Sequence, residues 1–458
     1  MNYESFIKTK TQWQSQCGFK CNDLPDCLYD FQKYLVEWAL GQGRGAIFAD
    51  CGLGKTIMQL AWAEKVIERT NKPVLILTPL AVGQQTMLEA EHFGIEAKRS
   101  RDGVIDDTKC IWITNYEQLH KFDQSRFSGV VCDESSCIKD FKSARKQSVV
   151  DFMRTIEFRL LCTATAAPND FWELGTSSEA LGLLGFRDMI TKFFKQETSK
   201  DHLGWGRTKY RFRGHAQEPF WSWVCSWARS LRNPDDLGFD GSAFVLPPLI
   251  ETNYIVETNK PRDGMLFSFA ARNLDEQRAE RRNSITERCE QASEFVLPND
   301  PTVFWCELND EANQLEKLIP DSKQVSGSMS DEKKEELLIA FSTGELKHLI
   351  TKPKIGAWGL NWQHCNNIVS FPSHSFERYY QSIRRCWRFG QKRPVDVRVI
   401  VNEGESAVIK SLQRKSEQAT VMFESIVAHM HNSMHLASND FFPEKETIPS
   451  WLDTKVLT

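Results

Sequence analysis

The stretch "FADCGLGKT" covers residues 48–56, and the interpretation of the whole sequence starts from it. It follows a short apolar run and leads into "TIMQLAWAEKVIERT", in which Ile57, Leu60 and Ala61 share one helical face. A glycine turn between a buried strand and a helix brings backbone N–H groups together at the helix N-terminus. The sequence therefore predicts a phosphate-binding loop here, although Ala49 stands where the first glycine is usual.

Four residues of this loop are candidates for nucleotide contacts. We expect the backbone at Gly52 and Gly54 to surround phosphate oxygens, because glycine lets the main chain approach a ligand closely. Lys55 would contact the outer phosphates, and the hydroxyl of Thr56 would bind Mg²⁺. ATP and Mg²⁺ are thus the expected cofactors, but the loop alone does not separate a kinase, a GTPase and a motor.

Apolar runs of strand length alternate with helical patterns from about residue 45 onward. A first series lies at 46–50, 74–78, 110–114, 129–134 and 159–163, and a second at 302–306, 348–351, 367–371 and 395–401. Continuous apolar runs are typical of strands that are covered on both faces, as in parallel sheets. We therefore predict an α/β fold with two lobes that face a cleft.

The run "VVCDESSCIK" (130–139) places Asp133 and Glu134 at the end of a predicted buried strand. The carboxyl ends of parallel strands meet at one edge of a sheet, so this pair would lie beside the phosphate loop. Asp133 is expected to hold Mg²⁺, and Glu134 to orient and deprotonate an attacking water.

The second lobe carries "YYQSIRRCWRFGQKRPV" (379–395). Gln381, Arg385 and Arg388 stand at i, i+4 and i+7, which predicts one face of a helix that ends near Phe389 and Gly390. Arginines on such a face would stabilise phosphate charge across the cleft.

The chain has 458 residues and a formal net charge of −4, so a basic groove, if there is one, is local. No apolar run approaches the roughly 20 residues that span a bilayer, and no basic-then-apolar pattern opens the sequence. We expect no membrane association, a monomer, and a location in the cytoplasm of a bacterial or phage-infected cell.

Taken together, these segments resemble a superfamily-two helicase, most closely of the Swi/Snf-like branch. "ADCGLGKT", "LILTPLAV", "DESS", "TAT", "TKPKIGAWGLNW" and "QSIRRCWRFGQ" follow the order of that family's motifs. The phrases "TATAAPNDFWELGTSSE" and "YYQSIRRCWRFGQ" also resemble helicases encoded by bacteriophages and prophages.

The resemblance implies two RecA-like lobes that close on ATP and step along a nucleic acid. It assigns Gln32 to the adenine base, Gln381 and Gly359 to the nucleotide, and Thr163 and Thr165 to coupling between hydrolysis and lobe movement. The residues implied to face the nucleic acid are Thr78, Pro79, Asn115, Tyr116 and Asn361.

The expected organisation has five parts. An N-terminal segment (1–27) precedes lobe 1 (28–190), a basic and Trp-rich connector (191–285), lobe 2 (286–425) and a peripheral tail (426–458). Residues 192–215 hold seven Lys or Arg against two acidic residues, which favours either a nucleic-acid contact or a solvated connector. Trp223 and Trp227 stand one helical turn apart, which favours a packing brace over a base-stacking surface.

The function implied is an ATP-dependent DNA helicase or translocase that works with replication or recombination proteins of a phage or mobile element. An RNA helicase and an ATP-gated clamp that does not move remain the alternatives.

Overall fold

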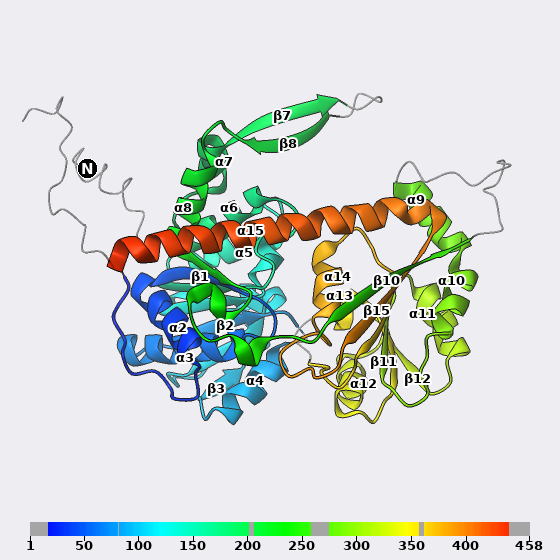
Figure 1. Cartoon of the computed structure of the whole chain (residues 1–458). Coiled ribbons are helices and arrows are strands. Elements are labelled where there is room, and N and C mark those ends of the chain that lie inside the picture. Colours follow the sequence, from blue (N-terminus) through cyan, green and yellow to red (C-terminus); the bar gives the residue numbers. More distant parts are fainter. Residues whose placement is uncertain (1–16, 81, 201–205, 258–273, 357–360, 439–458) are drawn as a thin grey trace, which may run out of the picture.

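The computed structural model describes residues 17–80, 82–200, 206–257, 274–356 and 361–438. Within these residues the chain forms two α/β lobes that lie side by side, with one long helix crossing both (Figure 1). Each lobe is built on its own parallel sheet, so the predicted fold class is confirmed.

The first lobe contains a seven-stranded sheet in the order β3-β4-β2-β5-β6-β1-β9, with every pair parallel. Its strands are β1 (Arg44–Ala49), β2 (Val74–Thr78), β3 (Ala97–Arg99), β4 (Ile111–Asn115), β5 (Gly129–Asp133), β6 (Phe158–Cys162) and β9 (Ala228–Leu231). β2, β4, β5 and β6 are buried throughout, as their continuous apolar runs predict. This order brings the ends of β1, β5 and β6 to one edge of the sheet.

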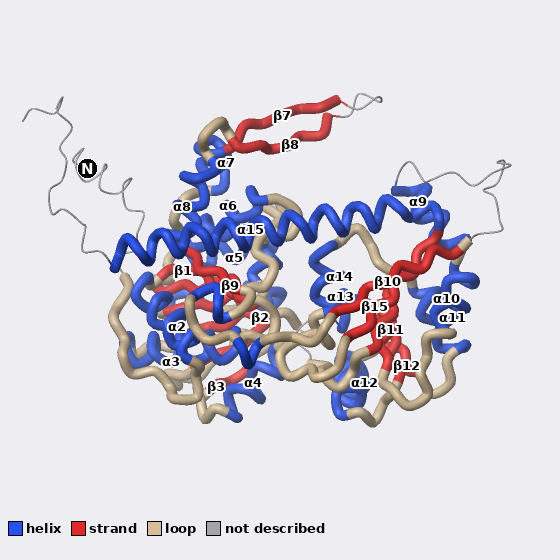
Figure 2. The backbone as a smooth tube through the Cα atoms, viewed as in Figure 1, coloured by secondary structure: helices blue, strands red, loops and turns tan. Residues whose placement is uncertain are grey.

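Helices cover both faces of this sheet (Figure 2). The helices of this lobe are α2 (Asp30–Gln42), α3 (Lys55–Thr70), α4 (Gly83–His92), α5 (Ala144–Met153), α6 (Leu174–Leu181), α7 (Phe186–Phe193), which lies at the base of the hairpin described below, and α8 (Gln217–Trp227). Trp221, Trp223 and Trp227 of α8 are buried in the core of the first lobe, which confirms that this Trp-rich helix is a packing brace.

The second lobe contains a six-stranded parallel sheet in the order β10-β15-β14-β11-β13-β12. The strands are β10 (Leu249–Val256), β11 (Thr302–Trp305), β12 (Ser322–Val325), β13 (His348–Thr351), β14 (Asn367–Ser370) and β15 (Val395–Asn402). Around it lie α9 (Leu274–Asn283), α10 (Ile285–Ser293), α11 (Asn309–Leu318), α12 (Asp331–Thr343), α13 (Pro353–Gly356) and α14 (Phe376–Ile383).

The predicted connector, residues 191–285, contributes to both lobes. Its strand β9 joins the first sheet, β10 joins the second, and its antiparallel hairpin of β7 (Phe194–Lys200) and β8 (Gly206–Phe212) projects from the first lobe (Figure 1). No strand in this region was predicted from the apolar runs of the sequence. β10 is an edge strand with mostly exposed side chains, so it lacks the apolar run by which the buried strands were found.

The long helix α15 (Ser406–Ser438) begins in the second lobe and ends on the first (Figure 1). Val408 and Leu412 pack with Phe376 of the second lobe, whereas Ile426 and Met430 are buried in the core of the first. The expectation of a peripheral tail from residue 426 is therefore wrong at Ile426 and Met430, because the buried apolar side of the helix continues to Met430.

Candidate nucleotide site between the lobes

The phosphate loop joins the end of β1 to the start of α3. Gly52 and Gly54 adopt positive φ angles of 90° and 74°, a region that favours glycine. Gly54 is the N-cap of α3, and no side chain among the described residues caps that helix start. The N–H groups of the first turn are thus open to an anionic ligand, as the sequence predicts.

Gln32 of α2 packs directly against this loop. Its amide nitrogen donates to the Leu53 carbonyl at 3.0 Å, and its amide oxygen accepts from the Tyr29 N–H at 3.0 Å. A Cβ on Gly54 would lie 2.3 Å from the Gln32 Nε2 atom, so a larger residue here would have to displace the Gln32 amide. Gln32 therefore holds the loop in shape, and its contact with an adenine base stays a prediction.

Lys55 lies within the curve of the loop. Its Nζ atom donates to the Ala49 carbonyl at 2.9 Å and to the Asp50 carbonyl at 3.1 Å. The ammonium group is thereby held beside the N–H groups that open α3, which is where phosphate oxygens would collect.

Asp133 and Glu134 end β5 at the same sheet edge. The Gln59 side chain of α3 donates to Asp133 Oδ1 at 2.7 Å, and this contact joins the carboxylate to the helix that follows the phosphate loop. Burial and the nearby Glu134 carboxylate raise the pKa of Asp133 to about 6. A bound cation would stabilise the ionised form of this carboxylate, which is the effect that a metal ion has on its carboxylate ligands.

The backbone of Glu134 is in the left-handed region, with φ 49° and ψ 54°. The Thr163 hydroxyl donates to Glu134 Oε2 at 3.2 Å and also accepts from the Thr165 N–H at 3.1 Å. A non-glycine residue in this conformation is uncommon and is maintained by its surroundings. The loop after β6 thus orients the carboxylate that is predicted to act on water.

A magnesium ion fits the oxygen donors at this edge. The hydroxyl of half-buried Thr56 and the carboxylate of Asp133 are ligands that Mg²⁺ prefers, with phosphate and water oxygens completing its shell. No group of three or more His, Cys, Asp and Glu side chains in the described part of the chain has the arrangement of an all-protein metal site. The donor set therefore suits a metal that arrives with phosphates.

The second lobe meets the phosphate loop directly. A Cβ on Gly52 would lie 2.9 Å from the Phe389 backbone nitrogen and 3.6 Å from the Arg388 Cβ. The segment that carries the predicted arginines is therefore packed on the loop that carries Lys55. Burial and the neighbouring Arg385 lower the pKa of Arg388 to about 10, so a bound anion would relieve a crowded pair of cations.

The predicted helix through Arg385 and Arg388 is wrong. α14 ends at Ile383, Arg384 is its C-cap, and the chain then turns. The two arginines therefore lie on this turn and not on one helical face. Gln381 does lie on α14, and both polar atoms of its buried amide lack a hydrogen bond among the described residues. Its contact with the nucleotide stays a prediction.

Arg384 was not predicted as a site residue, yet it forms a buried ion pair with the first lobe. Its Nη2 atom lies 2.7 Å from Asp50 Oδ2 and 2.8 Å from the Cys51 carbonyl oxygen. Although burial alone would lower its pKa, the Asp50 carboxylate raises the pKa of Arg384 above its usual range. The missed signal is the spacing of Glu377, Tyr380 and Arg384, which also defines a helical face.

Most of the residues expected to face a nucleic acid are buried. Thr78, Asn115 and Tyr116 have exposed fractions of 1%, 6% and 5%, and the Tyr116 hydroxyl donates to the Asp133 carbonyl at 2.6 Å. These side chains fix the ends of β2, β4 and β5, so the structure does not present them to a strand. Pro79 is half-buried and Asn361 is exposed, whereas Gly359 lies outside the described residues.

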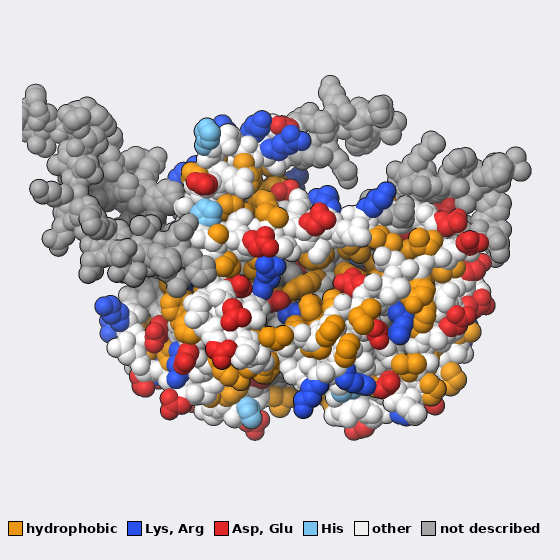
Figure 3. Space-filling model, in the orientation of Figure 1, with side chains coloured by type: hydrophobic (Ala, Val, Ile, Leu, Met, Phe, Trp, Pro, Cys, Tyr) orange, Lys and Arg blue, Asp and Glu red, His pale blue; other side chains and the backbone are white. Residues whose placement is uncertain are grey.

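The described part of the basic segment 192–215 contains the two strands of the projecting hairpin. The Phe194 and Phe212 rings stack at its base, 4.6 Å apart between centroids. Lys195 and Arg211 both pair with Glu197, at 3.2 Å and 3.1 Å. Lys and Arg side chains gather over this hairpin in Figure 3. Its contact with nucleic acid stays a prediction.

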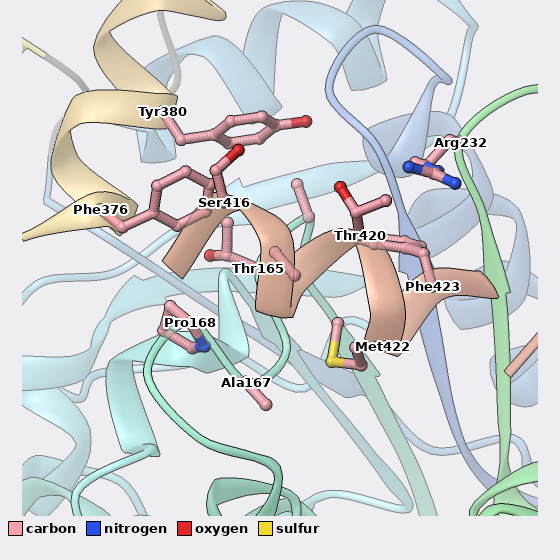
Figure 4. Close-up of a pocket in the computed structure, with 12 residues that line it drawn as sticks. Thr165, Ala167, Pro168, Arg232, Phe376, Tyr380, Ser416, Thr420, Met422 and Phe423 are labelled. Carbon is pink, nitrogen blue, oxygen red and sulfur yellow. The ribbon is translucent and has the colours of Figure 1, made fainter. Parts of the chain in front are cut away.

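A cavity of about 80 Å³ lies between the two lobes and α15. Thr165 and Pro168 line it from the first lobe, Phe376 and Tyr380 from α14, and Phe423 from α15 (Figure 4). The loop that positions Glu134 through Thr163 therefore lies next to both the second lobe and the long helix.

Part of the second lobe matches a known protein family. Residues 287–390 match the family described as the helicase conserved C-terminal domain. This range runs from α10 through the turn that carries Arg388, and so contains the segment that meets the phosphate loop.

Curated relatives match about a third of the chain. Helicase swr1 of Schizosaccharomyces pombe is 32% identical over 170 residues, which is 32% of this chain and 13% of that protein. Helicase swr-1 of Neurospora crassa is 28% identical over 170 residues, covering 32% of this chain and 9% of that protein. The chain thus spans about a tenth of the length of these relatives, both of which are helicases by name.

Two solved structures match most of the chain, and one of them shares the fold with a TM-score above 0.5. S. cerevisiae Dbp5 bound to RNA and ADP BeF3 has a TM-score of 0.54 and 12% identity, covering 92% of this chain and 96% of that chain. The Sulfolobus solfataricus SWI2/SNF2 ATPase core in complex with dsDNA has a TM-score of 0.41 and 15% identity, covering 92% and 97% of the two chains. None of the helices in the described residues has the length and hydropathy that a membrane span requires.

Proposed function

We propose that this chain is an ATP-dependent DNA helicase or translocase that couples hydrolysis to movement along DNA. The observation that carries the proposal is the packing of Arg388 and Phe389 on Gly52, which brings the second lobe onto the phosphate loop. A basic group from one lobe and the acids Asp133 and Glu134 from the other thus belong to one cleft. This is the arrangement that makes ATP hydrolysis depend on how the two lobes sit relative to each other.

In the proposed reaction the oxygen of a water molecule bonds to the γ-phosphorus of ATP as the bond to the β,γ-bridging oxygen breaks. Glu134, oriented by the Thr163 hydroxyl, accepts the proton that the water loses. Lys55 and Arg388 neutralise charge on the phosphate oxygens, and ADP leaves with that bridging oxygen. Bound Mg²⁺ would supply further positive charge, with Thr56 and Asp133 as the side chains that hold it.

The proposed track is DNA, because the sequence of the second-lobe turn resembles the Swi/Snf-like branch and the curated matches are of that kind. The projecting basic hairpin and the exposed Asn361 are proposed to contact it. A role in replication or recombination of a phage or mobile element rests on the resemblance of the quoted phrases alone.

The test is ATP hydrolysis by the purified chain alone and with single-stranded DNA, duplex DNA or RNA. We expect strong stimulation by DNA, and loss of turnover with ATP binding retained in Glu134→Gln. Glu336→Gln is the control, since Glu336 is an exposed side chain on α12. Displacement of a triplex-forming strand then separates movement from strand opening. Equal rates with and without every polynucleotide would contradict a motor, stimulation by RNA alone would favour the RNA helicase, and stimulation without displacement would favour the clamp.

A further inference from the structure

The side of α14 that meets the first lobe carries three side chains in one row. Glu377, Tyr380 and Arg384 stand at i, i+3 and i+7, which places them on the same helical face. Arg384 is the C-cap residue, with φ −70° and ψ −2°, so it continues the helical path. Each of the three forms a hydrogen bond with a residue of the first lobe.

The first contact point is Asp50, the residue that follows β1. Arg384 pairs with its Oδ2 at 2.7 Å, and the Tyr380 hydroxyl donates to its Oδ1 at 2.5 Å. The Arg384 and Asp50 side chains are only 3% and 9% exposed. The arginine also lies over the Trp387 ring, 4.8 Å from its centroid, which completes its desolvated environment.

Asp50 is part of the phosphate loop itself. Its Oδ1 atom accepts from the Cys51 N–H at 2.7 Å, and its carbonyl accepts from Lys55. An unpaired carboxylate here would repel a triphosphate, because like charges at short distance in a buried site interact strongly. Arg384 neutralises that carboxylate, so a loop with an acidic second position can still receive an anion.

The second contact point is Lys139, which forms an ion pair with Glu377. Lys139 follows the short helix Ser135–Ile138, which itself follows Glu134. The polarity is opposite to that of the first pair: the first lobe supplies the acid in one pair and the base in the other. If the partners were exchanged, Arg384 would face Lys139. Glu377 would then face Asp50, so both contacts would bring like charges together.

We propose that Glu377, Tyr380 and Arg384 form a two-point clamp that docks the second lobe on the loops carrying Lys55 and Glu134. They are positioning residues, because they act on the phosphate loop and on the Arg388 turn without needing contact with substrate. The docking itself stands on the geometry of the ion pairs. An effect of this docking on ATP turnover rests on the proposed ATP-dependent function.

Double-mutant cycles test both points of the clamp. At the first, Asp50→Asn keeps an oxygen for the Cys51 N–H and removes the charge, and Arg384→Gln removes the guanidinium. At the second, Lys139→Met is used with Glu377→Gln, because Glu173 also lies near Lys139 and a charge reversal would repel it. Arg393→Gln is the control, since Arg393 forms an exposed pair with Asp300 at 2.9 Å within the second lobe.

The readouts are hydrogen–deuterium exchange of segments 50–56 and 377–389, and the radius of gyration from X-ray scattering, both without nucleotide. We expect each single change in the clamp to speed exchange in both segments by about tenfold or more and to increase the radius of gyration. Each double variant should be no worse than its more damaging single variant, because the second change removes a group that is already without its partner. Tyr380→Phe should give a smaller change in the same direction, and Arg393→Gln none.

Exchange and scattering equal to those of the unchanged protein in Arg384→Gln and Glu377→Gln, or additive effects in both cycles, would overturn the clamp. If Arg384→Gln does not fold, Tyr380→Phe and the Lys139–Glu377 cycle decide the matter alone. These readouts need no hydrolysis. If the chain does not hydrolyse ATP but exchange in the two segments changes as expected, the proposed function is contradicted and the clamp is supported. If the chain is active but exchange in these segments does not change, the clamp is contradicted and the proposed function is supported.

Discussion

Arg384 and Asp50 come from opposite lobes, 334 positions apart in the sequence, and their side chains meet at 2.7 Å. The contact places the second lobe on the first residues of the phosphate loop, close to where Phe389 packs on Gly52. The cleft is therefore a set of direct side-chain contacts between two sheets of similar design. Four predictions follow from its details, and a fifth concerns the helix that crosses it.

Thr163 is predicted to hold Glu134 in its working orientation. Thr163→Val keeps the shape but removes the hydroxyl that donates at 3.2 Å, so we expect turnover to fall by about tenfold or more with little change in ATP affinity. Thr163→Ser should restore most of the rate. Thr114→Val is the control, because the buried Thr114 hydroxyl has no hydrogen bond among the described residues. Wild-type turnover in Thr163→Val would contradict this role.

Asp133 is predicted to destabilise the nucleotide-free protein at neutral pH. Its folded-state pKa of about 6 is raised from the usual value, so the stability it contributes is present at low pH and lost as pH rises through 6. Asp133→Asn should therefore be more stable than the wild type at pH 7.5, by about 1–3 kcal/mol, and the difference should shrink toward pH 4.5. Thermal unfolding at both pH values without nucleotide measures it. A difference that is independent of pH would show that Asp133 does not titrate in this range.

Gly54→Ala is expected to damage the phosphate loop by more than backbone strain. The new Cβ would lie 2.3 Å from Gln32 Nε2, in addition to the positive φ of 74°. Gly238→Ala is the matched control, since Gly238 has a φ of 79° and nothing within 4 Å of the built Cβ. We expect ATP affinity, measured with a fluorescent analogue, to fall by about tenfold or more in Gly54→Ala and to stay unchanged in Gly238→Ala. Equal affinity in the two variants would remove the argument for close packing by Gln32.

The end of α15 is predicted to stabilise the first lobe. Ile426 and Met430 are both fully buried there, so Ile426→Ala or Met430→Ala should lower the free energy of unfolding by about 2–4 kcal/mol. Val421→Ala, at a position 46% exposed on the same helix, should change it by about 0.5 kcal/mol or less. Urea denaturation followed by tryptophan fluorescence compares them, and equal effects at 426 and 421 would contradict the packing.

Sequence patterns predicted the central strands well and the edges poorly. β2 and β13 coincide with their apolar runs, because a strand covered on both faces must be apolar throughout. β3 has three half-buried residues and β10 is mostly exposed, so neither leaves such a pattern. The β7–β8 hairpin is basic and projects from the core, which hides it in the same way.

Site residues that belong to local sequence motifs were predicted. A contact between residues that are far apart in the sequence was missed. Lys55, Asp133 and Glu134 follow strands whose ends a parallel sheet brings together, so their proximity can be inferred from spacing. The pairing of Arg384 with Asp50 depends on how two lobes dock, which no local pattern contains. α14 ends at Ile383, so the helical face predicted to carry Arg385 and Arg388 does not extend to them. Arg384, at the C-cap, is the arginine that continues the helical path.

The central claim is that a guanidinium of the second lobe acts on phosphates held by the first, and Arg388→Ala tests it most directly. DNA-stimulated ATP hydrolysis should fall by more than about tenfold while ATP affinity changes little, as expected of a contact made in the transition state. Arg393→Ala, which changes an exposed arginine of the same lobe, should keep the wild-type rate. Undiminished turnover in Arg388→Ala, or a loss explained entirely by weaker ATP binding, would contradict the account.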